Sequence, residues 1–196
     1  MILFEEDFAN QGAMADTETK NLSWLKMAIM LNRMGIRNNL FPLALYDKDL
    51  QGRDPYNLND PSVELRQRIG FEAKRNPWYY LRELVRISAA GTGGIPYILS
   101  RANLAQSWVF LNSINGFLTM PRQCGKTVNS MAICSWYLYI AGYNIKMGEF
   151  CKGHELQTQN VDRLKKIRDA LPKWLVHQTA ADTNNKEGIA YDYLKT

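Results

Sequence analysis

The feature that most constrains this chain is a Gly-Lys-Thr triplet at residues 125–127. It follows a short apolar segment, residues 117–120, and it opens a long apolar segment, residues 126–141. A strand that passes through a tight turn directly into a helix is the setting in which Gly-Lys-[Ser/Thr] binds phosphate. The sequence therefore predicts a buried strand over 117–120, a turn over 121–125 and a helix over 126–141.

The residue types of this turn match what phosphate binding requires. A glycine lets the backbone approach phosphate oxygens without a clash from Cβ, and the N–H groups at the start of a helix favour an anion. Lys126 would reach the β- and γ-phosphates of a nucleoside triphosphate, and the Thr127 hydroxyl would ligate Mg²⁺. The match has one departure, because Met120 stands where the usual pattern has its first glycine.

Helical and extended segments alternate around the triplet. Helices are expected over residues 103–112 and about 155–171, and strands over 144–151 and 189–194. This alternation is typical of a parallel sheet covered by helices. We predict an α/β fold of the P-loop NTPase type, with a RecA/ASCE-like parallel sheet.

The first ninety residues have a different character. Helices are expected over about 17–34, 63–73 and 78–87. The segment from 38 to 61 is interrupted by several prolines, which predicts irregular structure. A glycine-rich stretch follows that lacks the preceding strand and the Lys-Ser/Thr pair of a phosphate loop. The predicted organisation is a helical and irregular arm over 1–90, a Gly-rich linker over 91–100 and a partial P-loop domain over 101–196.

Composition narrows the class of protein. With 46% hydrophobic and 22% charged residues the chain can fill a core, and the apolar stretch from 131 to 143 is too short to span a membrane. Three cysteines without a C-x-x-C pair favour a reducing compartment, and no signal peptide is visible, so we expect an intracellular protein. Residues 61–196 carry a net charge of +8 and residues 1–60 carry −3, which fits either a polyanionic partner such as DNA or an ordinary scatter of charge.

The hexapeptide Arg-Gln-Cys-Gly-Lys-Thr at 122–127 resembles the variant Walker A motif of the large terminase subunit of tailed bacteriophages. These ATPases drive genomic DNA into the empty capsid. Other segments resemble the large terminases of big myophages and occur in the expected order, at residues 43–50, 74–83, 101–106, 151–154 and 163–168. The resemblance covers residues 40 to 196.

This resemblance implies roles for individual residues. Arg122 would act in cis on the γ-phosphate, so that Arg122 and Lys126 are the expected catalytic pair. Asn103 and Gln106 stand where such ATPases read the adenine edge, because an amide both donates and accepts; a helix cap or a surface position is the open alternative. The implied contacts to ATP are Asn103, Gln106, Arg122, Gln123, Cys124, Gly125, Lys126 and Thr127, with Thr127 as the Mg²⁺ ligand.

The resemblance also implies partners and a location. Double-stranded DNA would be the translocated polymer, and the portal protein and the small terminase subunit would be protein partners. The complete motor would form a homo-oligomeric ring in the cytoplasm of the infected host cell, away from membranes.

An ATPase of this class needs a second motif, in which an apolar strand ends in Asp-Glu. The aspartate holds the Mg²⁺ shell and the glutamate polarises the attacking water. No such run follows Thr127. We therefore expect the N-terminal part of a motor, without its Walker B motif and nuclease domain, which binds nucleotide weakly at best and does not turn it over efficiently. The alternatives are a nucleotide-gated binding or assembly module without turnover, and a fragment of a P-loop helicase.

Overall fold

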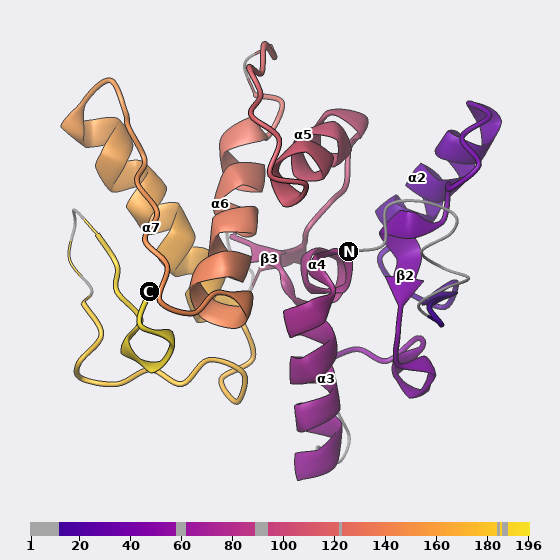
Figure 1. Cartoon of the computed structure of the whole chain (residues 1–196), viewed down its shortest axis with the longest axis horizontal. Helices are drawn as coiled ribbons and strands as arrows, with labels where there is room; N and C mark the ends of the chain where they lie inside the picture. The colour runs from indigo at the N-terminus through magenta and orange to yellow at the C-terminus, as the bar shows by residue number, and fades with distance from the viewer. Residues whose placement is uncertain (1–11, 58–61, 89–93, 122, 184, 186–187) are drawn as a thin grey trace.

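The computed structural model describes residues 12–57, 62–88, 94–121, 123–183, 185 and 188–196, and every element below lies in these ranges (Figure 1).

Serine residues cap two of the main helices. Ser62 caps α3 (Val63–Arg75), because its Oγ accepts a backbone N–H of the first turn at 3.1 Å. Ser100 caps α5 (Arg101–Leu111) in the same way at 3.2 Å. Each serine satisfies a backbone donor that the start of a helix leaves open.

The remaining elements are short strands, single turns and longer helices (Figure 1). In chain order they are β1 (Met14–Ala15), α2 (Leu22–Arg33), η1 (Phe41–Leu43), β2 (Ala44–Leu45), η2 (Lys48–Leu50), α4 (Pro77–Tyr79), η3 (Tyr80–Leu84), β3 (Arg86–Ile87), β4 (Ile95–Pro96), α6 (Lys126–Trp136), η4 (Tyr137–Ala141), α7 (His154–Ala170) and η5 (Asp192–Leu194). The elements η3 and η4 are π-helical turns that continue α4 and α6.

Aromatic side chains from separate elements meet in the core of the N-terminal half. Trp78 of α4 lies edge-to-face against Trp24 of α2 and Phe41 of η1, with ring centroids 6.5 and 5.1 Å apart. Tyr97 packs on Trp24 at 6.4 Å, and its carbonyl oxygen accepts the Trp24 indole N–H. All of these rings are buried. Because buried aromatic rings contribute large apolar areas, this cluster holds α2, η1 and α4 together.

A fully buried guanidinium lies in the same half of the molecule. Arg82 Nε donates to Glu83 at 2.7 Å and Nη1 donates to the Pro42 carbonyl oxygen at 2.8 Å, and Nη2 lies 3.5 Å from Asp16. The Thr19 hydroxyl donates to the same Glu83 carboxylate at 2.6 Å. A buried charge is tolerated only when it is paired, so this group fixes the segment before α2 against η3.

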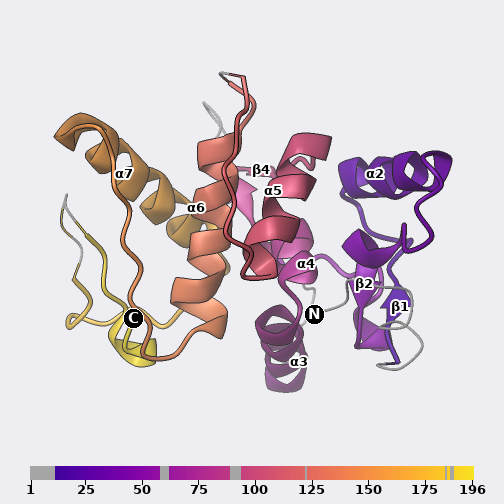
Figure 2. The ribbon, with the colours of Figure 1, turned by 45° about the horizontal axis from the view of Figure 1, so that its top comes forward.

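Helices α5, α6 and α7 lie side by side, with α6 in the middle (Figures 1 and 2). The π turn η4 closes at Gly142, whose N–H donates to the Tyr137 carbonyl oxygen at 2.9 Å. A Cβ at Gly142 would lie 2.3 Å from that oxygen and 2.4 Å from the Ile145 side chain. Only glycine fits at this position.

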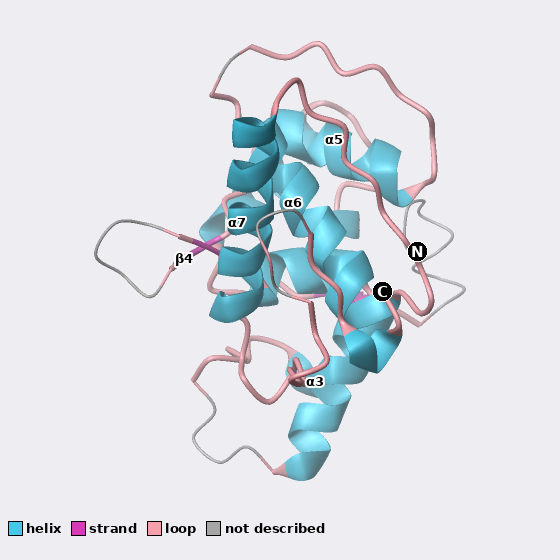
Figure 3. Ribbon diagram, turned by 90° about the vertical axis from the view of Figure 1, so that its left-hand side faces the viewer, coloured by secondary structure: helices cyan, strands magenta, loops and turns pink. Residues whose placement is uncertain are grey.

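The parallel sheet predicted for the C-terminal half is absent from the described residues, and the RecA/ASCE-like P-loop NTPase prediction is therefore wrong. The sheets described are two antiparallel pairs of two-residue strands, β1 with β2 and β3 with β4. Residues 117–120 and 144–151 form no regular element, and the segment predicted as a strand over 189–194 has only an isolated bridge at residue 189 and the single turn η5 at 192–194. Figure 3 shows how helices and loops dominate the molecule.

The physical reason is the lack of strand partners. An extended segment must pair its N–H and C=O groups with a neighbour, and within the described residues neither segment forms a strand ladder; a single bond, from the Asn144 N–H to the Leu194 carbonyl oxygen at 2.9 Å, joins one of them to residue 194. Phe117 is 96% exposed and Phe150 is 100% exposed, so the apolar residues that suggested buried strands face outward. Helix α6 packs directly against α5 and α7 instead of on a sheet.

The predicted linker contains a strand. Ile95–Pro96 form β4, which pairs antiparallel with β3 in the register Arg86 to Pro96 and Ile87 to Ile95. The glycine-rich residues 91–93 and residues 1–11 of the predicted arm lie outside the described residues.

Candidate functional site

The predicted phosphate turn lies immediately before α6 and has an alternating backbone. Gln123 (φ 63°) and Gly125 (φ 75°) are left-handed, and Cys124 between them is not. Such alternation turns successive N–H groups toward one side and creates a concavity that suits an anion. Gly125 is also the N-cap of α6, and without a Cβ it takes this conformation at little cost. Gln123 and Gly125 thus give this turn the kind of backbone alternation that anion-binding loops use.

Lys126 and Thr127 form the start of α6. The Lys126 side chain is exposed, and its Nζ lies 3.3 Å from the Met120 carbonyl oxygen, so it curls back across the turn. An ammonium group at this place adds to the positive end of the helix dipole. Thr127 is half-buried beside it. Both side chains therefore stand at the end of α6 where phosphate and Mg²⁺ are expected.

Two amide side chains of α5 lie against the same turn. A Cβ built on Gly125 would be 3.5 Å from Asn103 Nδ2 and 3.6 Å from Asn103 Oδ1. Gln106 Nε2 donates to the Lys126 carbonyl oxygen at 3.1 Å and to Ser130 Oγ at 2.7 Å. Both amides are more than nine-tenths buried, yet Asn103 Oδ1 and Gln106 Oε1 have no hydrogen-bond partner in the described part of the chain. Unpaired buried acceptors are costly, which makes these oxygens candidates for a ligand contact.

The structure thus brings together residues that the sequence singled out about twenty positions apart. Asn103 and Gln106 lie beside the turn that carries Lys126 and Thr127. Both amides are buried rather than at the surface, and Ser100 supplies the side-chain cap of α5. The other expected catalytic residue, at position 122, lies outside the described residues.

Sequence reasoning missed the residue that joins α5 to α6 behind the turn. Asn129 is fully buried, and its Nδ2 donates to the Asn103 carbonyl oxygen at 3.2 Å. Its Oδ1 accepts the Tyr97 hydroxyl at 2.5 Å and the Ser107 hydroxyl at 3.0 Å. The available signal was an asparagine inside an otherwise apolar helical segment, since a polar group there needs partners.

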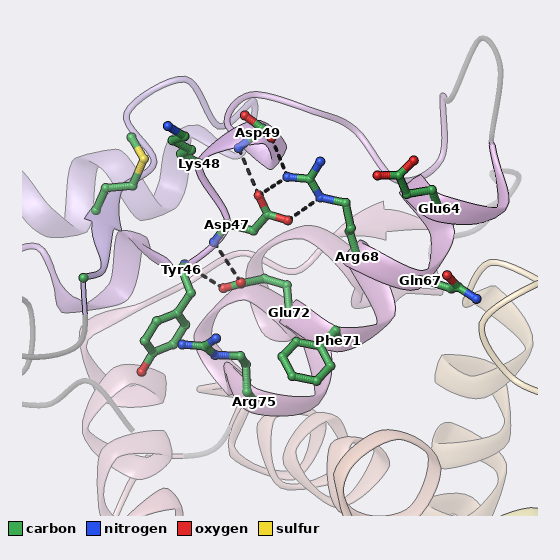
Figure 4. A pocket seen from close by; sticks show the side chains of 12 residues that line it. Tyr46, Asp47, Lys48, Asp49, Glu64, Gln67, Arg68, Phe71, Glu72 and Arg75 are labelled. Atoms are coloured by element: carbon green, nitrogen blue, oxygen red, sulfur yellow. Dashed lines mark hydrogen bonds and ion pairs between the residues drawn. The ribbon is translucent and has the colours of Figure 1, made fainter.

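A separate hollow of about 760 Å³ lies between η2 and α3 (Figure 4). Arg68 donates to both carboxylate oxygens of Asp47, at 2.7 and 2.5 Å, and to Asp49. Glu72 accepts the backbone N–H of Asp47 at 3.1 Å. The hydrogen bond from Arg68 holds the pKa of Asp47 below its ordinary value, against the opposing effect of burial. These groups satisfy one another, which indicates that they fasten η2 to α3.

The described residues contain no group of three or more His, Cys, Asp or Glu side chains arranged around a metal position. A Mg²⁺ ion that arrives with a triphosphate needs few protein ligands, because phosphate oxygens and water fill most of its octahedral shell. One hydroxyl at Thr127 fits that requirement. Among the thiols, burial raises the pKa of Cys134 to about 11, so this thiol stays protonated at neutral pH.

Comparisons of the chain with protein-family models, with characterised proteins and with solved structures find no match. Within the described ranges, no helix has the length and apolar character needed to cross a lipid bilayer. Fold and site together define a mainly helical chain with a turn of alternating backbone, left-handed at Gln123 and Gly125, at the start of α6. The argument for function therefore depends on that turn.

Proposed function

We propose that the turn at residues 123–127 binds the triphosphate of ATP together with Mg²⁺, as the nucleotide-binding part of a DNA-packaging ATPase of the large terminase type. One observation carries the nucleotide site: left-handed Gln123 and Gly125, the Lys126 ammonium group and two buried amides converge at the junction of α5 and α6. The DNA-packaging part depends on the sequence resemblance over residues 40–196 and not on the fold.

Each residue has its own task in this proposal. The N–H groups of the turn and of the first turn of α6 bind phosphate oxygens. Lys126 exchanges its contact with the Met120 carbonyl oxygen for the β- and γ-phosphates. The Thr127 hydroxyl ligates Mg²⁺, which neutralises charge on the triphosphate. Asn103 Oδ1, which lacks a partner in the described residues, accepts the exocyclic amino group of adenine.

The variant Lys126→Ala tests the nucleotide site. Removal of the counter-charge should lower the affinity for Mg-ATP by about two orders of magnitude in isothermal titration calorimetry. Lys74→Ala is the matched control, because Lys74 is an exposed lysine of α3 and its loss changes the net charge equally. Equal affinities of the Lys126→Ala variant and the unmodified chain would contradict the proposal.

Phosphate release tests the motor part. This chain has no apolar run ending in Asp-Glu after Thr127, so we expect its steady-state ATPase rate to stay near background, with or without DNA. A rate comparable to that of a complete packaging ATPase would contradict this. Arg122→Ala should leave Mg-ATP affinity unchanged; a loss equal to that of Lys126→Ala would assign Arg122 to ground-state binding.

A nucleotide-gated binding or assembly module is the second candidate, and the turn with Lys126 at the start of α6 supports it equally. It binds Mg-ATP at the same turn and never hydrolyses it. The two candidates differ once an acidic motif is supplied on a longer chain. DNA-stimulated hydrolysis by that longer chain supports the motor, and tight binding without turnover supports the module.

A further inference from the structure

Asn129 connects the amides at the turn with the interior of the molecule. It is fully buried, and its carboxamide makes three hydrogen bonds, as donor to the Asn103 carbonyl oxygen and as acceptor from Tyr97 and Ser107. Because its donor and its acceptor oxygen are both engaged, the orientation of this carboxamide is fixed. The backbone at Asn103 is therefore tied to α6 at one defined place.

Tyr97 extends this network into the N-terminal core. Its side chain is 1% exposed, and its hydroxyl donates to Asn129 at 2.5 Å. Its carbonyl oxygen accepts the side-chain N–H groups of Asn21, at 3.0 Å, and Trp24, at 3.2 Å. A continuous set of hydrogen bonds thus leads from the start of α2 through Tyr97 and Asn129 to α5.

We propose that Asn129 and Tyr97 are positioning residues that align the base-contacting amide of the nucleotide site by holding Asn103 beside Gly125. This inference rests on the proposed function. Asn103 Oδ1 has no hydrogen-bond partner among the described residues, so the place of this acceptor depends on the backbone that Asn129 holds and on the Tyr97 hydroxyl, which interacts with the Asn103 side chain. The turn and Lys126 bind phosphate independently of these side chains, since neither the Asn129 nor the Tyr97 side chain bonds to the turn in the described contacts; only the Asn129 backbone N–H does so, as an ordinary helical donor to the Gly125 carbonyl oxygen at 2.9 Å.

The test compares a ligand that has a base with one that has none. Affinities for Mg-ATP and for magnesium inorganic triphosphate are measured by calorimetry on the full chain and on Asn129→Ala. We expect the variant to lose about tenfold in affinity for Mg-ATP, the equivalent of a hydrogen bond that is no longer aligned. The affinity for inorganic triphosphate should change by less than about twofold.

Tyr97→Phe is a milder second variant, because it deletes one oxygen and keeps the aromatic ring. It should lower Mg-ATP affinity by about threefold and leave the affinity for inorganic triphosphate unchanged. Tyr80→Phe is the matched control. Tyr80 is as fully buried as Tyr97. Its hydroxyl bonds at 2.7 Å to Ser135, which lies on α6 like Asn129 but away from the turn. This control should bind both ligands like the unmodified chain.

The outcomes separate the two proposals. If the unmodified chain binds neither Mg-ATP nor inorganic triphosphate, the proposed function fails and the positioning role fails with it. If the unmodified chain binds both ligands, the folded Tyr97→Phe variant decides the positioning role. That role alone is overturned if the variant loses the same affinity for both ligands or keeps its affinity for both. Circular dichroism establishes that each variant is folded, and Tyr97→Phe decides the matter if Asn129→Ala does not fold.

Discussion

The aromatic cluster around α2, η1 and α4 and the segments that connect α5, α6 and α7 bury their large apolar side chains to very different degrees. Around α2, η1 and α4, Trp24 and Trp78 have no exposed surface. In the segments that connect α5, α6 and α7, Phe117 and Phe150 are almost entirely exposed. Both regions carry large apolar residues. They differ because helices bring apolar faces together in the first region, whereas the extended segments of the second pair with no strand in the described residues.

This contrast shows what an apolar pattern does and does not determine. A helix satisfies its own backbone, so an apolar stripe needs only another surface to pack against. An extended segment needs backbone partners as well, and those lie elsewhere in the sequence or in another chain. Apolar spacing therefore identified the helices reliably and the strands poorly.

The largest effect is expected at the centre of the buried region. Trp78→Ala removes a ring that packs on Trp24 and Phe41, and it should lower the free energy of unfolding by about 3–5 kcal/mol, because little of the cavity can collapse. Urea denaturation followed by circular dichroism measures this. A loss below about 1 kcal/mol would mean that the aromatic cluster is not tightly packed in solution.

A smaller effect is expected where one side chain joins two elements. Asn76 caps α4 by accepting the Tyr79 N–H, and its Nδ2 donates to the Ala44 carbonyl oxygen and to Glu72. Asn76→Ala should lower the free energy of unfolding by about 2 kcal/mol. Asn32→Ala, at an exposed position of α2, is the control and should change it by less than about 0.5 kcal/mol. Equal losses in the two variants would contradict the described contacts.

A pH-dependent effect is expected between η2 and α3. Because Arg68 lowers the folded-state pKa of Asp47, the contribution of Asp47 is complete above its unfolded-state pKa of about 3.9 and is lost as the pH falls through the folded-state value. Asp47→Asn should therefore narrow the difference in unfolding free energy between about pH 6 and about pH 3. The pair is partly exposed, so added salt should reduce the effect. An unchanged pH dependence would show that the ion pair does not form in solution.

The smallest effect is expected in the exposed region. Phe150→Ser removes a fully exposed ring and should change the free energy of unfolding by less than about 0.5 kcal/mol. Thermal unfolding of the two proteins side by side measures the difference. A loss above about 2 kcal/mol would break the comparison, because it would show that this ring is buried in the protein as it exists in solution.

The helices were predictable because their signals are local. The segment expected to be helical over 126–141 corresponds to α6 with η4, and the one over about 155–171 corresponds to α7. Apolar spacing, a capping serine before α3 and Pro172 after α7 all act within a few residues of the helix they define. The predicted strands at 117–120 and 144–151 depended on pairing at a distance, and no feature of either segment reports that.

The candidate site likewise has one part that a local sequence pattern predicts and another that depends on contacts between distant residues. The triplet at 125–127 located the turn because a phosphate loop has a local sequence pattern. The bond between Tyr97 and Asn129 joins residues 32 positions apart, and neither belongs to a known motif. Only the folded structure shows that the segment after β4 meets α6 at these two residues, which is why sequence reasoning found the turn and missed its support.

The π turn that closes at Gly142, at the end of η4, limits which residues this position can accept during evolution. At Gly142 a single added carbon would overlap a carbonyl oxygen and the Ile145 side chain. Gly153, just before α7, has open space around its Cβ position and an extended backbone that any residue adopts. Related sequences should therefore have many different residues at position 153 and keep glycine at position 142. Two glycines only eleven positions apart should thus differ strongly in how fast they are substituted.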